Sequence, residues 1–202
     1  MDRSDLIFRA KIGLAVAVWF ALLYGGADLV MRGADDLSSE LTPWDEMLPF
    51  WPSFAYLYLS VTPFLCLPLL VLSDRTGLQV LALTLMVEIA VGALIFVTFP
   101  VASPPFPPGP HPAPLRFADM INLDLNNLPS LHVALTVTTY LAMRSSLGRA
   151  QAPVAFWAAL IVLSTLVTRQ HDLVSAGAGA VLAALGHWGI APVLRRLIQE
   201  PA

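Results

Sequence analysis

Residues 78–99 read LQVLALTLMVEIAVGALIFVTF, an apolar run in which Glu88 is the only charged side chain. A helix that crosses a membrane needs about 20 mostly apolar residues, and this run meets that requirement. The sequence predicts an all-α fold, a bundle of six transmembrane helices that forms a single integral membrane domain over residues 1–202. The other five expected spans are residues 12–31, 51–73, 129–146, 153–170 and 173–194.

The composition of the chain also indicates a membrane protein. Hydrophobic residues make up 57% of the sequence and charged residues only 12%, with a mean hydropathy of +0.72. Soluble domains carry about 25% charged residues. The net charge of −3 comes with no basic patch, which argues against nucleic acid as a partner. Cys66 is the only cysteine, so no disulfide can form within the chain.

Basic residues predict the orientation of the bundle, because Lys and Arg favour the cytoplasmic ends of membrane helices. With a cytoplasmic N-terminus, eight of the eleven basic residues face the cytoplasm, and Arg32, Arg116 and Arg169 face outward. The sequence therefore predicts a multi-pass protein of the cell membrane with both termini in the cytoplasm. The outward segments would be residues 32–50, 100–128 and 169–172.

The first two outward segments differ in character. Residues 32–50 are acidic and contain aromatic residues, which favours a segment that lies along the membrane interface. Residues 100–114 contain eight prolines. Such a stretch cannot form a regular helix and favours extended polyproline geometry. We expect it to form a stiff rim or lid over the outer face.

Two polar motifs fall at the outward ends of predicted helices. Residues 126–134 read NNLPSLHVA, at the start of the fourth span, and residues 164–172 read STLVTRQHD, at the end of the fifth. Each motif contains one histidine, His132 in the first and His171 in the second. The topology therefore predicts that the two imidazoles lie at the same membrane face.

The first motif also has the features of an anion site. Asn127 is a candidate helix cap, and Pro129 suits a first helical turn. The free N–H groups of that turn, with the Ser130 hydroxyl, would bind an anion. The second motif adds the guanidinium of Arg169 at the same depth, a group suited to bidentate phosphate binding.

Taken together, the motifs resemble those of the type 2 phosphatidic acid phosphatase superfamily. The chain has Pro-Ser-Leu-His followed some forty residues later by Ser-Thr-x-x-Thr-Arg-Gln-His. The form with Leu131 is closest to the branch that contains inositol phosphoceramide synthases and related lipid phosphotransferases. The resemblance implies a membrane enzyme that moves a phosphoryl group on or off a phospholipid or sphingolipid, with its site on the non-cytoplasmic side. It implies no metal or other cofactor.

The resemblance further implies roles for three residues. His171 aligns with the nucleophile that becomes a phosphohistidine, and His132 with the general acid that protonates the departing alkoxide. Ser130 aligns with a phosphate-binding residue. Two imidazoles can divide these tasks because histidine is neutral or charged near neutral pH, and different environments separate the two pKa values.

One departure from the family pattern concerns the aspartate that orients the nucleophile, one helical turn after it. Here that position is Ser175. Asp172, Asp124 and Asp28 are the candidates for its role, although Asp172 can equally cap the sixth helix.

A second departure concerns the family's first motif, which usually supplies a lysine and an arginine to the phosphate. Residues 99–106 contain no basic residue. Arg169 and Arg116 are therefore the expected phosphate ligands.

Other interpretations stay open from the sequence. Either histidine could hydrogen-bond a helix end, and Arg169 could be an interfacial anchor. Glu88 could line a cavity or proton path, or bond to a neighbouring helix. A non-catalytic protein that binds or translocates phospholipid is the main alternative function, favoured by Ser175 and the missing first-motif bases. A transporter is a third, with Glu88 as its only indication.

Overall fold

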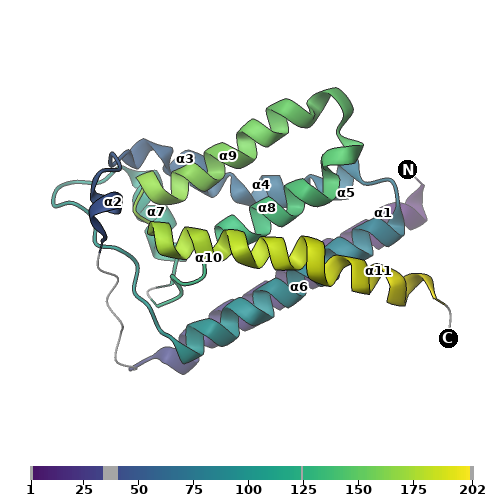
Figure 1. Cartoon of the computed structure of the whole chain (residues 1–202), viewed down its shortest axis with the longest axis horizontal. Helices are drawn as coiled ribbons and strands as arrows, with labels where there is room; N and C mark the ends of the chain where they lie inside the picture. Colours follow the sequence, from purple (N-terminus) through teal and green to yellow (C-terminus); the bar gives the residue numbers. More distant parts are fainter. Residues whose placement is uncertain (1, 34–40, 124, 201–202) are drawn as a thin grey trace.

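The structure is a computed structural model that describes residues 2–33, 41–123 and 125–200. These residues form helices joined by turns and loops, and their one β-type contact is an isolated bridge between Val101 and Asn126. The predicted all-α class is confirmed. The helices labelled in Figure 1 are α1 (Arg3–Met31), α2 (Pro43–Glu46), α3 (Ala55–Leu59), α4 (Val61–Cys66), α5 (Pro68–Val71), α6 (Arg75–Thr98), α7 (Ala113–Ile121), α8 (Leu131–Met143), α9 (Gln151–Val167), α10 (Leu173–Ala184) and α11 (Ala191–Gln199).

Five helical stretches in the described ranges are long and apolar enough to cross a membrane, and they coincide with five of the six expected spans. The fourth expected span differs, because its helix α8 has only 13 residues. At about 1.5 Å per residue α8 is roughly 20 Å long, less than the ~30 Å hydrocarbon core of a bilayer. A sixth crossing stays a prediction. The five stretches are Arg3–Met31, Pro52–Val71, Arg75–Thr98, Gly148–Val167 and Leu173–Gln199.

The short helix α8 lies inside the bundle, where it contacts α6, α9 and α10. Most of its side chains are buried. Both chain termini lie at one end of the bundle, so α8 carries the chain back from the opposite end, which holds α2 and α7 (Figure 1). We call these the terminus end and the loop end. Because neighbouring helices surround α8, it does not need to match the full thickness of lipid.

The second span is not one continuous helix. It is divided into the 3₁₀ turn Pro52–Phe54 and helices α3, α4 and α5. Proline lacks the N–H that an internal helical hydrogen bond needs, and Pro68 begins α5 as its first residue. At the break after α3, the Ser60 hydroxyl donates to the Leu57 carbonyl and accepts from the Trp157 indole N–H at 2.9 Å. This contact fixes the bent segment against α9.

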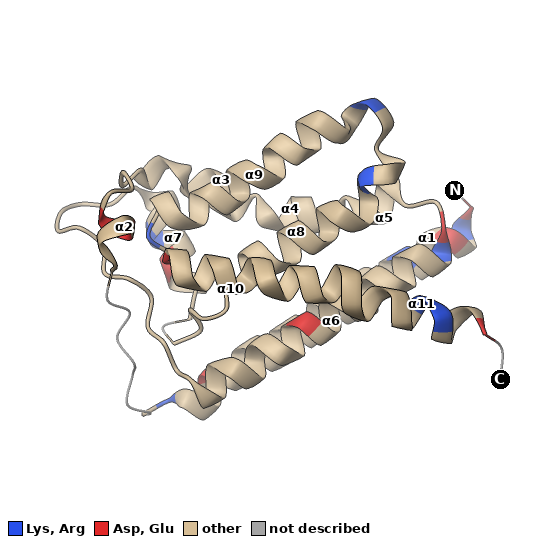
Figure 2. Ribbon diagram, viewed as in Figure 1, with Lys and Arg blue, Asp and Glu red and all other residues tan. Residues whose placement is uncertain are grey.

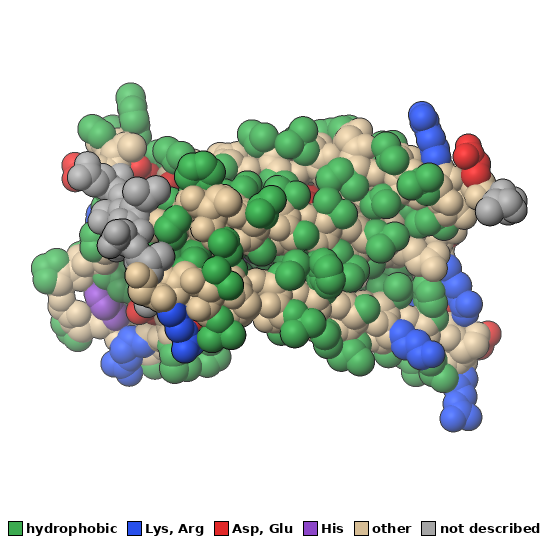
Figure 3. All heavy atoms as spheres, turned by 90° about the horizontal axis from the view of Figure 1, so that it is seen from below, with side chains coloured by type: hydrophobic (Ala, Val, Ile, Leu, Met, Phe, Trp, Pro, Cys, Tyr) green, Lys and Arg blue, Asp and Glu red, His purple; other side chains and the backbone are tan. Residues whose placement is uncertain are grey.

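Charge is distributed as a membrane protein requires. Figure 2 shows most Lys and Arg residues at the terminus end, on α1, α11 and the α8–α9 connection. Figure 3 shows hydrophobic side chains over the middle of one long face, with the basic side chains confined to its two ends. The helices thus present an apolar belt between polar ends. We regard the chain as an integral membrane protein.

Glu88 is buried in the middle of this belt. Its carboxylate accepts a hydrogen bond from the Thr138 hydroxyl of α8 at 2.6 Å, as expected for a polar group that bonds to a neighbouring helix. It also lies against Gly186 in the π-helical turn Leu185–Ile190, where a Cβ would collide with the carboxylate. The contact therefore joins three helices across the centre of the bundle.

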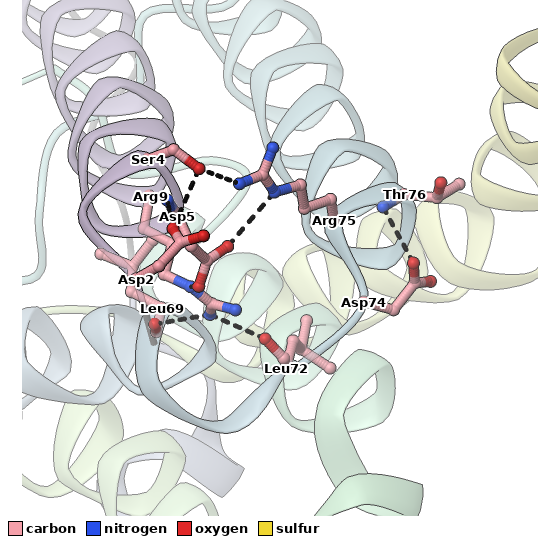
Figure 4. A network of polar contacts seen from close by, with 9 residues as sticks. All are labelled: Asp2, Ser4, Asp5, Arg9, Leu69, Leu72, Asp74, Arg75 and Thr76. Carbon is pink, nitrogen blue, oxygen red and sulfur yellow. Dashed lines mark hydrogen bonds and ion pairs between the residues drawn. The ribbon is translucent and has the colours of Figure 1, made fainter.

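Arg9 joins three segments at the terminus end (Figure 4). Its guanidinium bonds to Asp5 at 2.7 Å and donates to the carbonyls of Leu69 at 2.8 Å and Leu72 at 2.7 Å. These carbonyls belong to the last turn of α5 and the residue after it, where a helix leaves acceptors unpaired. Asp5 also accepts from Arg75 at the start of α6, at 3.3 Å. The cluster holds the first three spans together.

We predict that Arg9→Ala destabilises the protein by about 1–3 kcal/mol, because it leaves buried acceptors without a donor. The melting temperature in detergent, followed by tryptophan fluorescence, measures this. Arg3→Ala is the control, since Arg3 is exposed and has no polar partner in the described part of the chain. Equal melting temperatures for the two variants would contradict the role given to Arg9.

Candidate active site

Ser130 caps α8, the helix that begins within the first motif. Its Oγ accepts the Val133 N–H at 3.3 Å, and α8 starts at Leu131. The expectation that Asn127 caps this helix is wrong, as is the placement of Pro129 in its first turn, because both residues precede the cap. Ser130 is fully buried. The cap places His132 on the first turn of α8, beside the free N–H groups of the helix N-terminus.

The helix of the second motif ends earlier than expected, at Val167 instead of residue 170. The chain leaves α9 through a left-handed residue, Arg169, whose φ is 54°. The Gln170 N–H bonds to the Thr165 carbonyl and the Arg169 N–H to the Leu166 carbonyl, which is the Schellman pattern of a helix C-terminus. This turn carries His171 back across the end of the bundle.

The two histidines come together at the loop end, with ring centroids 5.9 Å apart. The backbone explains the close approach. The Ser130 N–H donates to the Ser175 carbonyl of α10 at 3.0 Å. Gly179, one turn further along α10, has no side chain, and a Cβ there would collide with the Ser130 carbonyl. The absence of a side chain at Gly179 thus allows α8 and α10 to touch.

The proton position on His171 follows from its surroundings. Its Nδ1 lies 2.8 Å from Asn127 Oδ1 and 3.1 Å from the Asn127 backbone carbonyl. Both partners are acceptors, so Nδ1 must carry the hydrogen in the neutral ring. Nε2 then carries the lone pair. This nitrogen is buried and has no hydrogen-bond partner within the described residues, which leaves it available to a ligand.

His171 also has an unusual acidity. Burial lowers the pKa of His171 to about 4, although the nearby charge of Asp172 and the hydrogen bond with Asn127 both raise it. The imidazole is therefore neutral around pH 7. A neutral imidazole with a buried, unpaired Nε2 is a nucleophile or a ligand of an electrophilic atom.

His132 has a different environment. Its ring stacks on the buried Tyr58 of α3, with centroids 4.1 Å apart, and Nδ1 lies 3.2 Å from the Tyr58 hydroxyl. The two histidines are thus held by different groups. Tyr58 was not singled out from the sequence, because an aromatic residue in an apolar span gives no sign of what it will contact.

Asp172 and Ser175 form the N-terminus of α10. Asp172 is its N-cap, accepting the Ser175 N–H at 2.6 Å, and Ser175 completes a capping box by bonding back to Asp172. The second Asp172 oxygen accepts from Asn127 Nδ2 at 3.0 Å. No hydrogen bond joins Ser175 to His171 in the described structure. Asp172 therefore does cap the sixth helix, and it also contacts the residue that holds His171.

The predicted cations differ in their placement. Arg169 is half-buried. Burial raises the pKa of the Asp45 carboxyl, but its hydrogen bonds and the charge of Arg169 bring that pKa below its usual value. Arg116 is exposed on α7 and has no polar partner among the described residues. The structure thus gives Arg169 a defined electrostatic neighbour.

Asp28 and Asp124 are the remaining acidic candidates from the sequence. Asp28 pairs with Arg32 at 3.4 Å near the end of α1. Asp124 lies outside the described residues, as do the acidic residues Asp35, Asp36 and Glu40 of the expected interfacial segment. In the described ranges, His, Cys, Asp and Glu side chains form no group of three that could hold a metal ion.

A chain of amides extends the site beyond the histidines. The Tyr24 hydroxyl donates to Asn122 Oδ1 at 2.9 Å, and Asn122 Nδ2 donates to Gln170 Oε1 at 2.9 Å. Gln170 is almost fully buried, and its Nε2 has no partner among the described residues. This amide is an unused donor next to His171. The sequence shows that Gln170 follows Arg169, but it does not show where the Gln170 amide points.

The proline-rich segment contacts the same region. The Asn127 N–H donates to the Val101 carbonyl at 3.2 Å. Further along the segment, Phe106 and His111 pack with Phe50, with ring centroids 5.3–6.2 Å apart. His111 is therefore half-buried between aromatic rings. Residues 113–121, expected as part of this loop, form helix α7 instead, because the proline run ends at Pro114 within its first turn.

An apolar cavity of about 440 Å³ starts at the histidine site and runs through the bundle. His132, Tyr58, Tyr24 and Asn122 form its polar part. The rest is lined almost entirely by hydrophobic side chains of α1, the second span, α6 and α8. On α1 alone the lining runs from Ile12 to Tyr24, about 18 Å at 1.5 Å per residue. The cavity is therefore long and mostly apolar.

The sequence profile of the PAP2 superfamily matches residues 37–189, a range that contains both histidines, both motifs and every helix from α2 to α10. The chain belongs to the PAP2 superfamily. Neither the curated proteins nor the solved structures gave a significant match. Membership indicates an enzyme of the phosphatase or phosphotransferase type, and it agrees with the apolar helices in making this PAP2 chain a membrane protein.

The backbone of Arg169 supports a role for its side chain in this PAP2 site. A side chain at φ 54° costs on the order of 1–3 kcal/mol, and glycine usually occupies this position in a Schellman turn. Strain of this kind concentrates at functional sites. A side chain that only anchored Arg169 at the membrane interface would not require this backbone strain.

We predict that Arg169→Gly keeps or raises the melting temperature, because glycine adopts this backbone conformation without strain. We also expect turnover of a lipid phosphate to fall by about 10–100-fold, because the variant loses a hydrogen bond to a charged group. Arg116→Ala is the comparison variant, for which the exposed side chain predicts a smaller loss. A lipid phosphatase assay and a thermal melt of the same preparations measure both effects. Retained turnover in Arg169→Gly would assign Arg169 to anchoring alone.

Proposed function

We propose that this protein is a membrane enzyme that transfers a phosphoryl group from a lipid phosphate or phosphodiester through a phosphohistidine on His171. The observation that carries the proposal is the buried, unpaired Nε2 of a neutral His171 beside a second histidine. The substrate would be a phospholipid or sphingolipid. The excess of basic residues at the terminus end supports a site on the non-cytoplasmic side of the cell membrane.

In the first half-reaction the Nε2 lone pair attacks phosphorus, and the bond from phosphorus to the lipid oxygen breaks. His132, which enters the step protonated, donates that proton to the departing oxygen, so the lipid leaves as a neutral alcohol and His132 becomes neutral. In the second half-reaction water or an alcohol attacks the phosphohistidine and gives its proton to His132. The phosphorus–nitrogen bond breaks, and both imidazoles return to their starting states. Splitting the displacement in this way lowers each barrier.

Four groups are suited to hold the phosphoryl oxygens. The N-terminus of α8 supplies free N–H groups and a positive dipole end. Gln170 offers its unpaired amide N–H, and Arg169 offers a positive charge. These groups compensate for the basic residues that the chain lacks in the first motif. The Ser130 hydroxyl, which accepts from Val133, keeps its own proton for a phosphoryl oxygen.

The acceptor decides between hydrolysis and transfer. Water gives a phosphatase, and a second lipid alcohol gives a phosphotransferase. The Pro-Ser-Leu-His form of the first motif, by its resemblance to inositol phosphoceramide synthases, favours transfer. The apolar lining of the cavity supports the same choice, since it disfavours water near the intermediate.

We predict that His171→Ala lowers turnover by at least about 10³-fold, because no other group can form the covalent intermediate. Purified protein in mixed micelles would be given labelled phosphatidic acid, diacylglycerol pyrophosphate, or an inositol phospholipid with ceramide. Free phosphate and new phospholipid would both be counted. His187→Ala is the control, since His187 lies in the π-helical turn away from the site. If wild type and His171→Ala bind these lipids but turn none over, the non-catalytic lipid-binding alternative takes the place of this proposal.

The apolar cavity supports a lipid as the substrate, because it can hold one hydrocarbon chain with its phosphate at His132. Val16 lines the cavity, and Val18 on the same helix is 48% exposed on the outside. We predict that Val16→Trp lowers kcat/KM for a long-chain lipid phosphate by about tenfold or more, the loss of two or more buried methylene groups. Val18→Trp should leave it unchanged.

A water-soluble, short-chain phosphate monoester is the substrate control for this pair. It reaches the histidines but does not fill the cavity, so Val16→Trp should turn it over like the wild type. Equal losses on both substrates would mean that the substitution damages the site itself. Equal kcat/KM of Val16→Trp and Val18→Trp on the long chain would place the hydrocarbon chain elsewhere.

A further inference from the structure

We propose that Asn127, held by Asp172, is the residue that positions the nucleophile His171. This inference rests on the proposed function and names a component of that site. The position where the family resemblance implies an orienting aspartate is Ser175, and Ser175 is occupied in the capping box of α10. Another group must therefore fix the imidazole.

The hydrogen bonds form a continuous path from His171 to Asp172. His171 Nδ1–H donates to Asn127 Oδ1 at 2.8 Å, and Asn127 Nδ2–H donates to Asp172 Oδ2 at 3.0 Å. The other Asp172 oxygen accepts the Ser175 N–H at 2.6 Å. All four side chains are buried. Because Asp172 accepts from Nδ2, the Asn127 amide cannot turn over, and its oxygen must face the imidazole.

The Asn127 amide takes the place of a carboxylate that would otherwise orient the imidazole of His171. It fixes the tautomer with the lone pair on Nε2 and fixes the plane of the ring. It differs in charge, because the negative carboxylate of Asp172 bonds to the Asn127 amide and not to the imidazole. The titratable groups that face His171 are then Asp172 of α10 and His132 of α8. The consequence is a nucleophile that stays neutral to lower pH than one paired directly with aspartate.

The first variant is Asn127→Ala. It keeps the backbone carbonyl of residue 127 as an acceptor for Nδ1 but leaves Asp172 without its amide donor. We expect kcat to fall by about 10–100-fold, the usual effect of removing a group that orients a reacting histidine. The loss is smaller than in His171→Ala because the backbone carbonyl still favours the correct tautomer.

The decisive variant exchanges the two side chains, Asn127→Asp with Asp172→Asn. Asn caps a helix as well as Asp does, so every hydrogen bond of the path can re-form with the carboxylate next to His171. Asn127→Asp alone places two carboxylates at about the present 3.0 Å contact, and Asp172→Asn alone places two amide NH₂ groups against each other. We expect the double exchange to exceed either single variant in kcat by about tenfold or more, a non-additivity typical of residues in one network.

The pH profile separates positioning from mere structural support. A carboxylate next to Nδ1 favours the protonated ring and so raises the pKa of His171. The nucleophile must be neutral, so activity is lost as pH falls through that pKa. The acidic limb of kcat/KM should therefore move to higher pH in the double exchange than in the wild type. Both proteins receive the same lipid phosphate, so the ionisation of the substrate cancels in the comparison.

Three results would overturn the proposal: turnover of Asn127→Ala within about twofold of wild type, a double exchange no better than Asn127→Asp, or an acidic limb that does not move. Each of these results counts only in an assay in which the wild type is active and His171→Ala is inactive. If His171→Ala keeps its turnover instead, the proposed function fails, and the failure is distinguishable from one confined to Asn127. Thermal melts of all variants identify any that do not fold.

Discussion

The hydrogen bond from the Ser130 N–H to the Ser175 carbonyl, 3.0 Å long, is the contact on which the site depends. It joins the cap of α8 to the first turn of α10, and it forms only because Gly179 leaves room for the Ser130 carbonyl. Once the two helix N-termini meet, the residues on either side of them meet as well. Asn127 reaches Asp172, and His132 comes within 5.9 Å of His171 between ring centroids.

The loops at this end obey the constraint that a membrane places on the backbone. Backbone groups away from water must find partners within the protein, and non-helical chain is tolerated only where it is buried or lines a cavity. Here the partners come from distant segments. The Asn127 N–H bonds to Val101, the Trp51 N–H bonds to Val167 at 2.7 Å, and the Leu173 N–H bonds to Asp45 at 2.7 Å. The proline-rich segment thus helps to hold the histidine loops in place.

The two histidines and the cavity give the site a consistent polarity. His171 is surrounded by the polar ends of α8, α9 and α10, where Asn127 fixes its tautomer. His132 lies between that polar region and the apolar cavity, stacked on Tyr58. A lipid phosphate has the same division into a charged group and a hydrocarbon chain. The polarity of the site therefore follows from where α8 begins, at the junction of the two environments.

The sequence by itself determined the all-α class, five of the long apolar spans and the two histidine motifs, because apolar runs and short motifs are local properties of the chain. It also identified Asp172 as a possible cap, since capping depends on neighbouring residues. Only the tertiary structure decided that Asn127 holds His171, that Tyr58 stacks on His132 and that α8 is short. These features depend on which helices touch. The turn that brings His171 into place was also not predictable, because its left-handed residue is Arg169 and a sequence argument expects glycine there.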